Sequence, residues 1–151
     1  MKKILTLLMV LLVLVGCSKK PEEPVEPKTM GEAYVLAFKN SKSTDPDAIV
    51  DELMALGKFE GTLVKNEVEP GWMMGVTVDV TDFEKAVSFG PMISTIPFIG
   101  YVLKSNNAEA LAKQLDENAD LAWNICTQAD EKQVVVKDDL VLFLMCRNSA
   151  E

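Results

Sequence analysis

Histidine is absent from this chain of 151 residues. Its absence removes Ser-His and Cys-His nucleophiles and every metal site that uses an imidazole ligand. The sequence also lacks a glycine-rich phosphate loop, the Gly-x-Ser-x-Gly motif of hydrolases and a Cys-x-x-Cys pair. An enzyme built on this chain would therefore work through carboxylates or lysine, and we expect no cofactor and no metal.

Positive charge is scarce as well. Lys and Arg number 15 against 23 Asp and Glu, so the formal charge is −8 at pH 7. Such an acidic chain is unsuited to binding nucleic acid or an anionic membrane surface through charge, so nucleic acid is not an expected partner. The length suffices for one ordinary domain and not for two.

The longest apolar run lies at the N-terminus. It spans Ile4–Val15, follows the basic start Met1–Lys3, and is interrupted only by Thr6. The run is too short for a membrane-spanning helix, which needs about 20 residues. Its length suits the apolar region of a secretory signal peptide instead.

The end of this run, Leu14-Val15-Gly16-Cys17, resembles the lipobox of bacterial lipoproteins. The resemblance implies that the Cys17 thiol receives a diacylglycerol carrying palmitate-type chains and that residues 1–16 are cleaved off. Loss of two lysines would then change the formal charge from −8 to −10. Two or more acyl chains give stable anchoring, here at the extracellular face of the cell membrane. A plain signal peptide or an uncleaved apolar anchor is the alternative.

Residues 18–29 have the composition of a spacer, with three prolines and six charged side chains. Such a segment forms neither a core nor a regular helix. In the polyproline conformation it spans at most about 37 Å, at roughly 3.1 Å per residue. The expected division is a signal peptide at 1–16, a lipidated cysteine and tether at 17–29, and one domain at 30–151.

Two helices are expected at the start of this domain. Thr29-x-x-Glu32 has the form of a capping box, and the apolar spacing beyond it predicts a helix to about Lys39. Asp45-Pro46 is a second helix start, with a stop at Gly57.

The middle of the domain mixes strand and helix signals. We expect strands over 62–69 and 72–80 on either side of the turn Pro70-Gly71. A short helix over 81–87 and a strand over 96–104 should follow. A longer helix is expected from Ala108 to Cys126, with a break near Asn118 left open.

The C-terminal residues predict a β-hairpin. Residues 132–137 and 140–147 are rich in β-formers and are separated by Asp138-Asp139. Both faces of this hairpin are apolar, so both should be covered, one by the stripe carrying Leu111, Leu115 and Trp123. The expected fold is a single α+β domain with helices packed on a mainly antiparallel sheet.

The cysteines other than Cys17 form an even pair, as a disulfide outside the cytoplasm requires. The hairpin turn places Cys146 opposite Glu131, close to the end of the long helix at Cys126. A Cys126–Cys146 disulfide would contribute about 3 kcal/mol. Two free thiols are the alternative.

Ala86–Leu103 contains no charged residue. A second membrane segment is disfavoured because glycines and prolines interrupt it, and a buried strand and loop is the plainest interpretation. A third interpretation is an apolar groove for a ligand or partner. Its candidate residues are Trp72, Met73, Met92, Ile93 and Phe98, with Met74 beside them.

Several segments of the domain resemble a group of small lipoproteins of anaerobic Firmicutes. The segments are Phe89-Gly90-Pro91-Met92-Ile93, Ile96-Pro97-Phe98-Ile99-Gly100-Tyr101, Trp123-Asn124-Ile125-Cys126, Val141-Leu142-Phe143 and Met145-Cys146. The resemblance implies a Gram-positive cell surface. It implies no catalytic residue.

Three functions fit these observations. The leading hypothesis is a non-catalytic, membrane-tethered module that binds an apolar ligand or an envelope protein. The second is a small cell-envelope hydrolase that uses paired carboxylates, which would need a cleft holding two or more acids. The third is a structural protein that forms a homodimer through an apolar sheet face.

Overall fold

The computed structural model describes residues 26–93 and 95–148. The helices in these residues are α1 (Met30–Asn40), α2 (Pro46–Met54) and α3 (Ala108–Glu117). The strands are β1 (Leu63–Glu67), β2 (Lys85–Pro91), β3 (Phe98–Lys104), β4 (Glu131–Lys137) and β5 (Leu140–Cys146).

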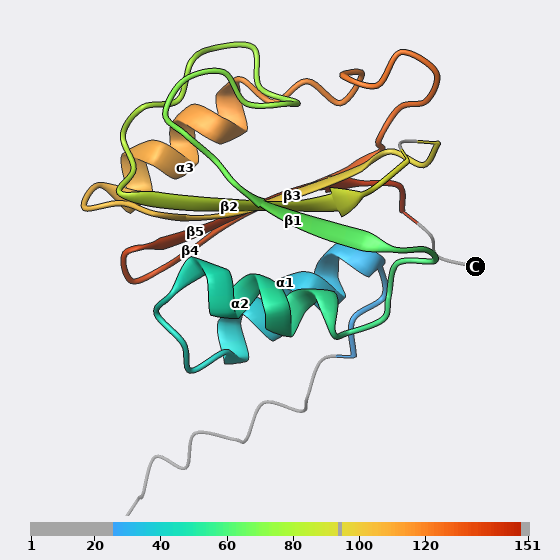
Figure 1. Ribbon diagram of the computed structural model, residues 1–151, viewed down its shortest axis with the longest axis horizontal. Helices are drawn as coiled ribbons and strands as arrows, with labels where there is room; N and C mark the ends of the chain where they lie inside the picture. The colour runs from blue at the N-terminus through green and yellow to red at the C-terminus, as the bar shows by residue number, and fades with distance from the viewer. Residues whose placement is uncertain (1–25, 94, 149–151) are drawn as a thin grey trace, which may run out of the picture.

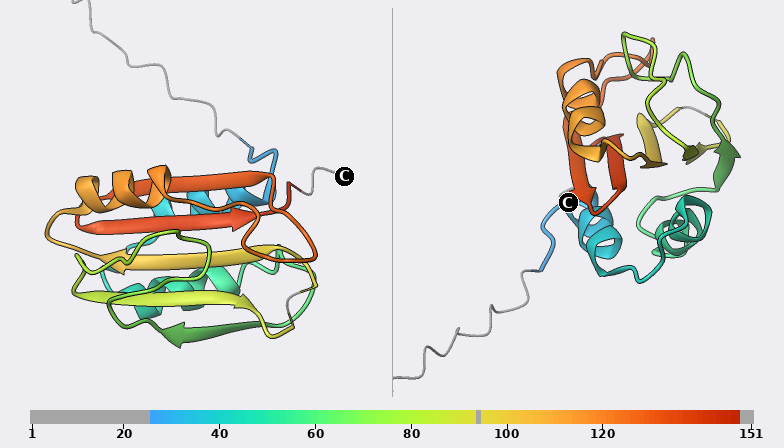
Figure 2. Two further views of the ribbon diagram at one scale, coloured as in Figure 1. Left: turned by 90° about the horizontal axis from the view of Figure 1, so that it is seen from above. Right: turned by 90° about the vertical axis from the view of Figure 1, so that its left-hand side faces the viewer.

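The strands form one antiparallel sheet in the order β1-β2-β3-β5-β4. Helices α1 and α2 cover one face, and α3 covers the other together with the long connection between β1 and β2 (Figure 1). The right-hand view in Figure 2 looks along the strands and shows the same layers on either side of the sheet. The expected α+β domain with helices on an antiparallel sheet is therefore confirmed.

The C-terminal hairpin follows its predicted register, with Glu131 opposite Cys146 and a turn at Asp138-Asp139. Asp138 has φ 55°, a left-handed conformation that this tight turn needs. All seven residues of β5 are buried. Leu142, Leu144 and Cys146 face the α1–α2 layer, and the alternate residues face the α3 layer, as the sequence predicts. Strand β4 lies at the edge of the sheet and β5 lies inside it.

The helix starts also follow the sequence. The Thr29 hydroxyl accepts a hydrogen bond from the Glu32 amide at 3.0 Å, which caps α1. Pro46 occupies the first turn of α2. Helix α3 ends at Glu117, because the Asn118 side chain donates to the Gln114 carbonyl at 2.8 Å and the next residue pairs with Val76. The break near Asn118 is thus present, and the helix does not continue to Cys126.

Two predictions for residues 72–87 are wrong. Residues 72–80 form a loop, because Gly71 and Gly75 have φ angles of 136° and 83° that turn the chain away from an extended strand. An isolated bridge joins Gly71 to Val80. The expected helix over 81–87 is absent: residues 81–84 are irregular, and Lys85 begins β2, which is paired with strands on both sides. The apolar residues of this segment fit the +3/+4 spacing of one helix face. A strand that is buried on both faces can carry apolar residues at the same positions, so the pattern does not distinguish the two structures.

The two ends of the sheet carry different connections. At one end, here called the proximal end, α1 begins and the connections 55–62, 92–97 and 118–130 meet. At the other, the distal end, lie the connections 41–45, 105–107 and 138–139, and the long connection 68–84 leaves from and returns to this end. The described chain therefore begins at the proximal end, on the right in Figure 1.

Candidate functional site

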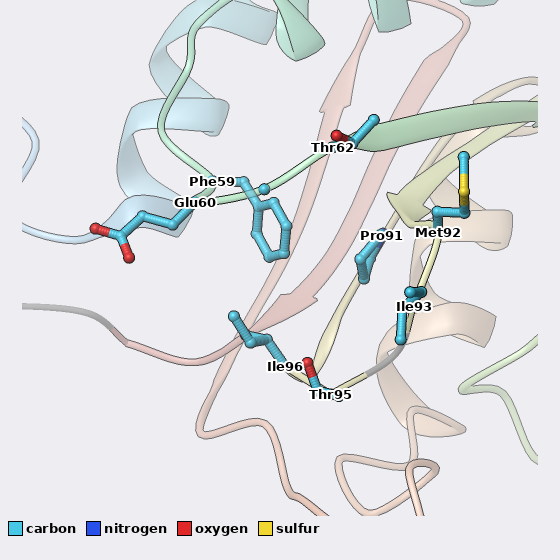
Figure 3. Close-up of a pocket in the computed structure, with 9 residues that line it drawn as sticks. Phe59, Glu60, Thr62, Pro91, Met92, Ile93, Thr95 and Ile96 are labelled. Atoms are coloured by element: carbon cyan, nitrogen blue, oxygen red, sulfur yellow. The ribbon is translucent and has the colours of Figure 1, made fainter.

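The first candidate site is an apolar hollow of about 300 Å³ at the proximal end. It lies between the connection that precedes β1 and the connection that joins β2 to β3 (Figure 3). Its lining residues are Phe59, Glu60, Gly61, Thr62, Pro91, Met92, Ile93, Thr95 and Ile96. The Glu60 side chain points away from the Phe59 ring, so the lining around that ring is apolar.

Phe59 joins this hollow to the core. Its ring centroid lies 5.0 Å from that of Phe98, which in turn lies 5.5 Å from Tyr34. Gly61 allows this position, because a Cβ there would lie 3.1 Å from a Phe59 ring carbon and its φ is 138°. The wall at Phe59 is therefore fixed by the core rather than by solvent-exposed contacts.

The opposite wall is much more exposed. Met92 and Ile93 have 69% and 74% of their surface exposed. The Met92 amide donates to the Thr62 carbonyl at 3.4 Å, which ties this wall to the start of β1. Neighbouring exposed apolar side chains of this size mark an interaction surface more often than single exposed residues do.

The five residues predicted to line one groove do not come together. Met73 is buried in the core below α3, and Phe98 is buried in the core above α1 and α2. Only Met92 and Ile93 line the apolar hollow, while Trp72 belongs to a second hollow. The prediction fails because residues 72–80 are a loop over the α3 layer, and because Phe98 points to the opposite layer.

The second hollow has a volume of about 380 Å³ and contains no charged residue. It is lined by Trp72, Met74, Gly75, Trp123, Asn124, Ile125 and Cys126. The Tyr101 hydroxyl donates to the Met74 carbonyl at 3.0 Å and fixes the loop from below. Ile125 is 100% exposed and lies beside Trp72, which is 70% exposed, so the two form an apolar rim on this hollow.

The predicted disulfide is not present. Cys126 and Cys146 are both free, the first exposed and the second buried. Cys146 does lie opposite Glu131 as expected, and its thiol donates to a carboxylate oxygen at 3.7 Å. Because α3 ends at Glu117, Cys126 lies in an exposed loop rather than at the end of a helix. Burial, followed by the nearby charge of Glu131, raises the pKa of the Cys146 thiol.

Glu131 connects the start of α1 to the sheet. One carboxylate oxygen accepts from the Thr29 hydroxyl at 2.5 Å, and the other accepts from the Gly31 amide at 3.3 Å. A Cβ on Gly31 would overlap this carboxylate. A negative charge at a helix N-terminus is favourable, because the free amides there carry partial positive charge.

One of the two acids in the candidate hydrolytic site is paired with lysine. A polar hollow between α3 and β4 contains Glu109 and Asp116. The Asp116 carboxylate lies 2.7 Å from Lys132, whose ammonium group also donates to the Asp116 carbonyl at 2.8 Å. In the described parts of the chain, no group of three or more His, Cys, Asp or Glu side chains is placed to hold a metal ion.

Phe59, Ile96 and Ile125 line the two hollows but were not predicted as site residues. The sequence contains a signal for two of them. Phe59 is an aromatic residue between Gly57 and Gly61, and Ile125 is an aliphatic residue beyond the helix break that the sequence left open near Asn118. Neither signal indicates whether the side chain is buried.

No family model, curated protein or solved structure matches this chain. The predicted lipidation site Cys17 lies outside the described residues. Within those residues, no helix is both long enough and apolar enough to span a bilayer.

Proposed function

We propose that this chain is a lipid-anchored module at the extracellular face of the cell membrane that binds an apolar ligand or an apolar segment of an envelope partner. The lipobox-like sequence at Cys17 supports the anchor. The observation that carries the binding function is the apolar hollow between Phe59 and the exposed pair Met92 and Ile93. Its volume of about 300 Å³ suits a small ligand or one or two side chains of a partner.

The hydrolase hypothesis has less support. Its best candidate is the hollow with Glu109 and Asp116, but Asp116 is ion-paired with Lys132 and more than half exposed. A hydrolase of this kind needs two carboxylates that face one substrate bond, and the Lys132 ammonium group already occupies the Asp116 carboxylate.

The dimer hypothesis loses the surface on which it was based. It required an apolar face of the sheet to remain open. Helices α1 and α2 cover one face, and α3 with the β1–β2 connection covers the other (Figure 1).

Two measurements test the proposed function. The first is the intact mass of the full chain extracted from its membranes, which should show loss of residues 1–16 and acyl mass on Cys17. An unmodified N-terminus at Met1 would contradict the anchor.

The second measurement is titration of the full chain with the fluorescent apolar probe N-phenyl-1-naphthylamine. We expect one saturable site, weakened at least tenfold by Ile93→Glu, because a charge in an apolar hollow is costly to desolvate. Thr44→Glu at the distal end is the matched control and should bind normally, because Thr44 is exposed. Equal binding by both variants would contradict the proposed site.

A further inference from the structure

The connections at the two ends of the sheet differ sharply in polarity. The three short connections at the distal end read Ser41-Lys42-Ser43-Thr44-Asp45, Ser105-Asn106-Asn107 and Asp138-Asp139, with no apolar residue. The long connection 68–84 also leaves from the distal end, but it folds over the α3 face, and its Trp72 lines the same hollow as Ile125. At the proximal end, Met92, Ile93 and Ile125 have 69%, 74% and 100% of their surface exposed. These three highly exposed apolar side chains therefore all lie at the proximal end.

The chain enters the domain at this same end. The Thr29 hydroxyl and the Gly31 amide both donate to Glu131, the first residue of β4. The loop that carries Ile125 runs directly into Glu131, and the Asp130 amide donates to the Cys146 carbonyl at 3.2 Å. The start of the domain and the root of the Ile125 loop are thus fixed to one another.

The distance from Cys17 to this end is short. The residues between Cys17 and Thr29 reach at most about 37 Å. A lipid on Cys17 would keep the proximal end within that distance of the bilayer, while the distal end lies a sheet length farther from the point of attachment (Figure 1).

We infer that the proximal end docks on the outer leaflet of the bilayer, with Met92, Ile93 and Ile125 inserted among the lipids. This inference rests on the proposed lipid anchor at Cys17. The hollow behind Met92 and Ile93 then opens toward the membrane, and Trp72 beside Ile125 lies at the depth where indole rings are favoured. The polar distal end faces away from the cell.

Charge contributes little to this docking. The formal charge of −10 that remains after loss of residues 1–16 opposes binding to an anionic leaflet, and the hollow around Ile125 contains no charged residue. Insertion of aliphatic side chains is the attractive interaction, so docking should persist at high salt.

The natural cysteines provide the experiment. Cys126 is exposed and next to Ile125, whereas Cys146 is buried, so an environment-sensitive fluorophore attaches at Cys126 without any substitution. The full lipidated chain is reconstituted into vesicles of phosphatidylcholine and phosphatidylglycerol that contain nitroxide-labelled lipid. The control carries the same label at Asn106→Cys in a Cys126→Ser background, at the distal end.

We expect at least twofold stronger quenching at Cys126 than at position 106, unchanged by 0.5 M NaCl. The double variant Met92→Asp with Ile93→Asp should remain anchored and lose at least half of that difference. Equal quenching of the two labels would overturn the docking. A second result would also overturn the docking. If the Cys126 label is shielded by an amount that increases with the protein density in the vesicles and shows no contact with lipid, a second copy of the chain covers this end.

The intact mass of the same sample separates the two proposals. Acyl mass on Cys17 with no difference between the labels leaves the anchor standing and removes the docking. Absence of acyl mass removes both. The unfolding transition of each variant should match the parent chain, because the substituted residues are exposed.

Discussion

The Thr29 hydroxyl donates a hydrogen bond of 2.5 Å to the carboxylate of Glu131, across 102 positions of sequence. This bond joins the first residues of the domain to an edge strand of the sheet. The second oxygen of the same carboxylate accepts from the Gly31 amide and from the Cys146 thiol. A single side chain therefore holds the start of α1 against the C-terminal hairpin.

Replacing Glu131 with alanine should destabilise the domain by about 2 kcal/mol, because two donors at the start of α1 lose a charged acceptor. Gly31→Ala should also destabilise it, since a Cβ would overlap the carboxylate. Urea unfolding measures both effects. Glu109→Ala, an exposed acid on α3, is the control and should stay within about 0.5 kcal/mol of the parent. A Glu131→Ala variant as stable as this control would contradict the role of the carboxylate.

The two cysteines of the domain should react at very different rates. We expect iodoacetamide at pH 8 to modify Cys126 readily in the folded chain, because it is exposed. Cys146 should react only after unfolding, because burial shields it and raises the pKa of its thiol. Peptide mass analysis before and after addition of denaturant distinguishes the two sites. If neither cysteine reacts until a reductant is added, the free thiols seen in the structure are wrong and a disulfide is present.

Two glycines in the strands, Gly90 and Gly100, allow a matched test of how tightly the core is packed around them. A Cβ at Gly100 would overlap the Phe89 ring, whereas a Cβ at Gly90 would lie 3.4 Å from its nearest neighbours. Gly100→Ala should therefore cost about 1–3 kcal/mol through overpacking, and Gly90→Ala should cost clearly less. Thermal and urea unfolding measure the difference. Equal losses would show that the Phe89 ring can move aside freely.

The Asp45–Lys85 ion pair should give stability a component that depends on pH. The hydrogen bond from Lys85 lowers the pKa of Asp45 below its ordinary value. The stabilisation is therefore present above the unfolded pKa of about 4 and is lost as the pH falls through the lower folded value.

Asp45→Asn should accordingly lower the melting temperature at pH 7 and have no effect near pH 2. Both side chains are exposed, so the effect should be small and should shrink further in 0.5 M NaCl. Glu109→Gln is the control for a simple change of net charge. A deficit for Asp45→Asn that persists at pH 2 would show that the cause is not ionisation.

The sequence predicted the parts of the fold that depend on local pattern. The N-cap at Thr29, the proline start of α2 and the turn at Asp138-Asp139 each set a local conformation, and all three are present. The capping box itself is half formed, because the Glu32 carboxylate accepts from the Lys28 amide. The hairpin pattern also predicted which residues face which layer, since alternation along a strand leaves only two choices.

The failures concern residues whose conformation depends on distant partners. The valines between 76 and 80 alternate like a strand, but the left-handed Gly75 and the bridge from Val76 to Ala119 make them a loop. The candidate groove failed for the same reason. Whether Met73 or Met92 is exposed depends on which layer covers it, and no spacing along the chain contains that information.

The position of β5 has a consequence for when the domain can fold. This strand pairs with β3 on one side and with β4 on the other, and it is buried on both faces. During synthesis, β3 cannot pair with β5 until residues 140–146 have been made. Before that moment both layers of the core lack their shared central strand. The nascent chain therefore remains open and sensitive to protease until almost all of the described residues have emerged, and its folding is governed by a late, non-local pairing.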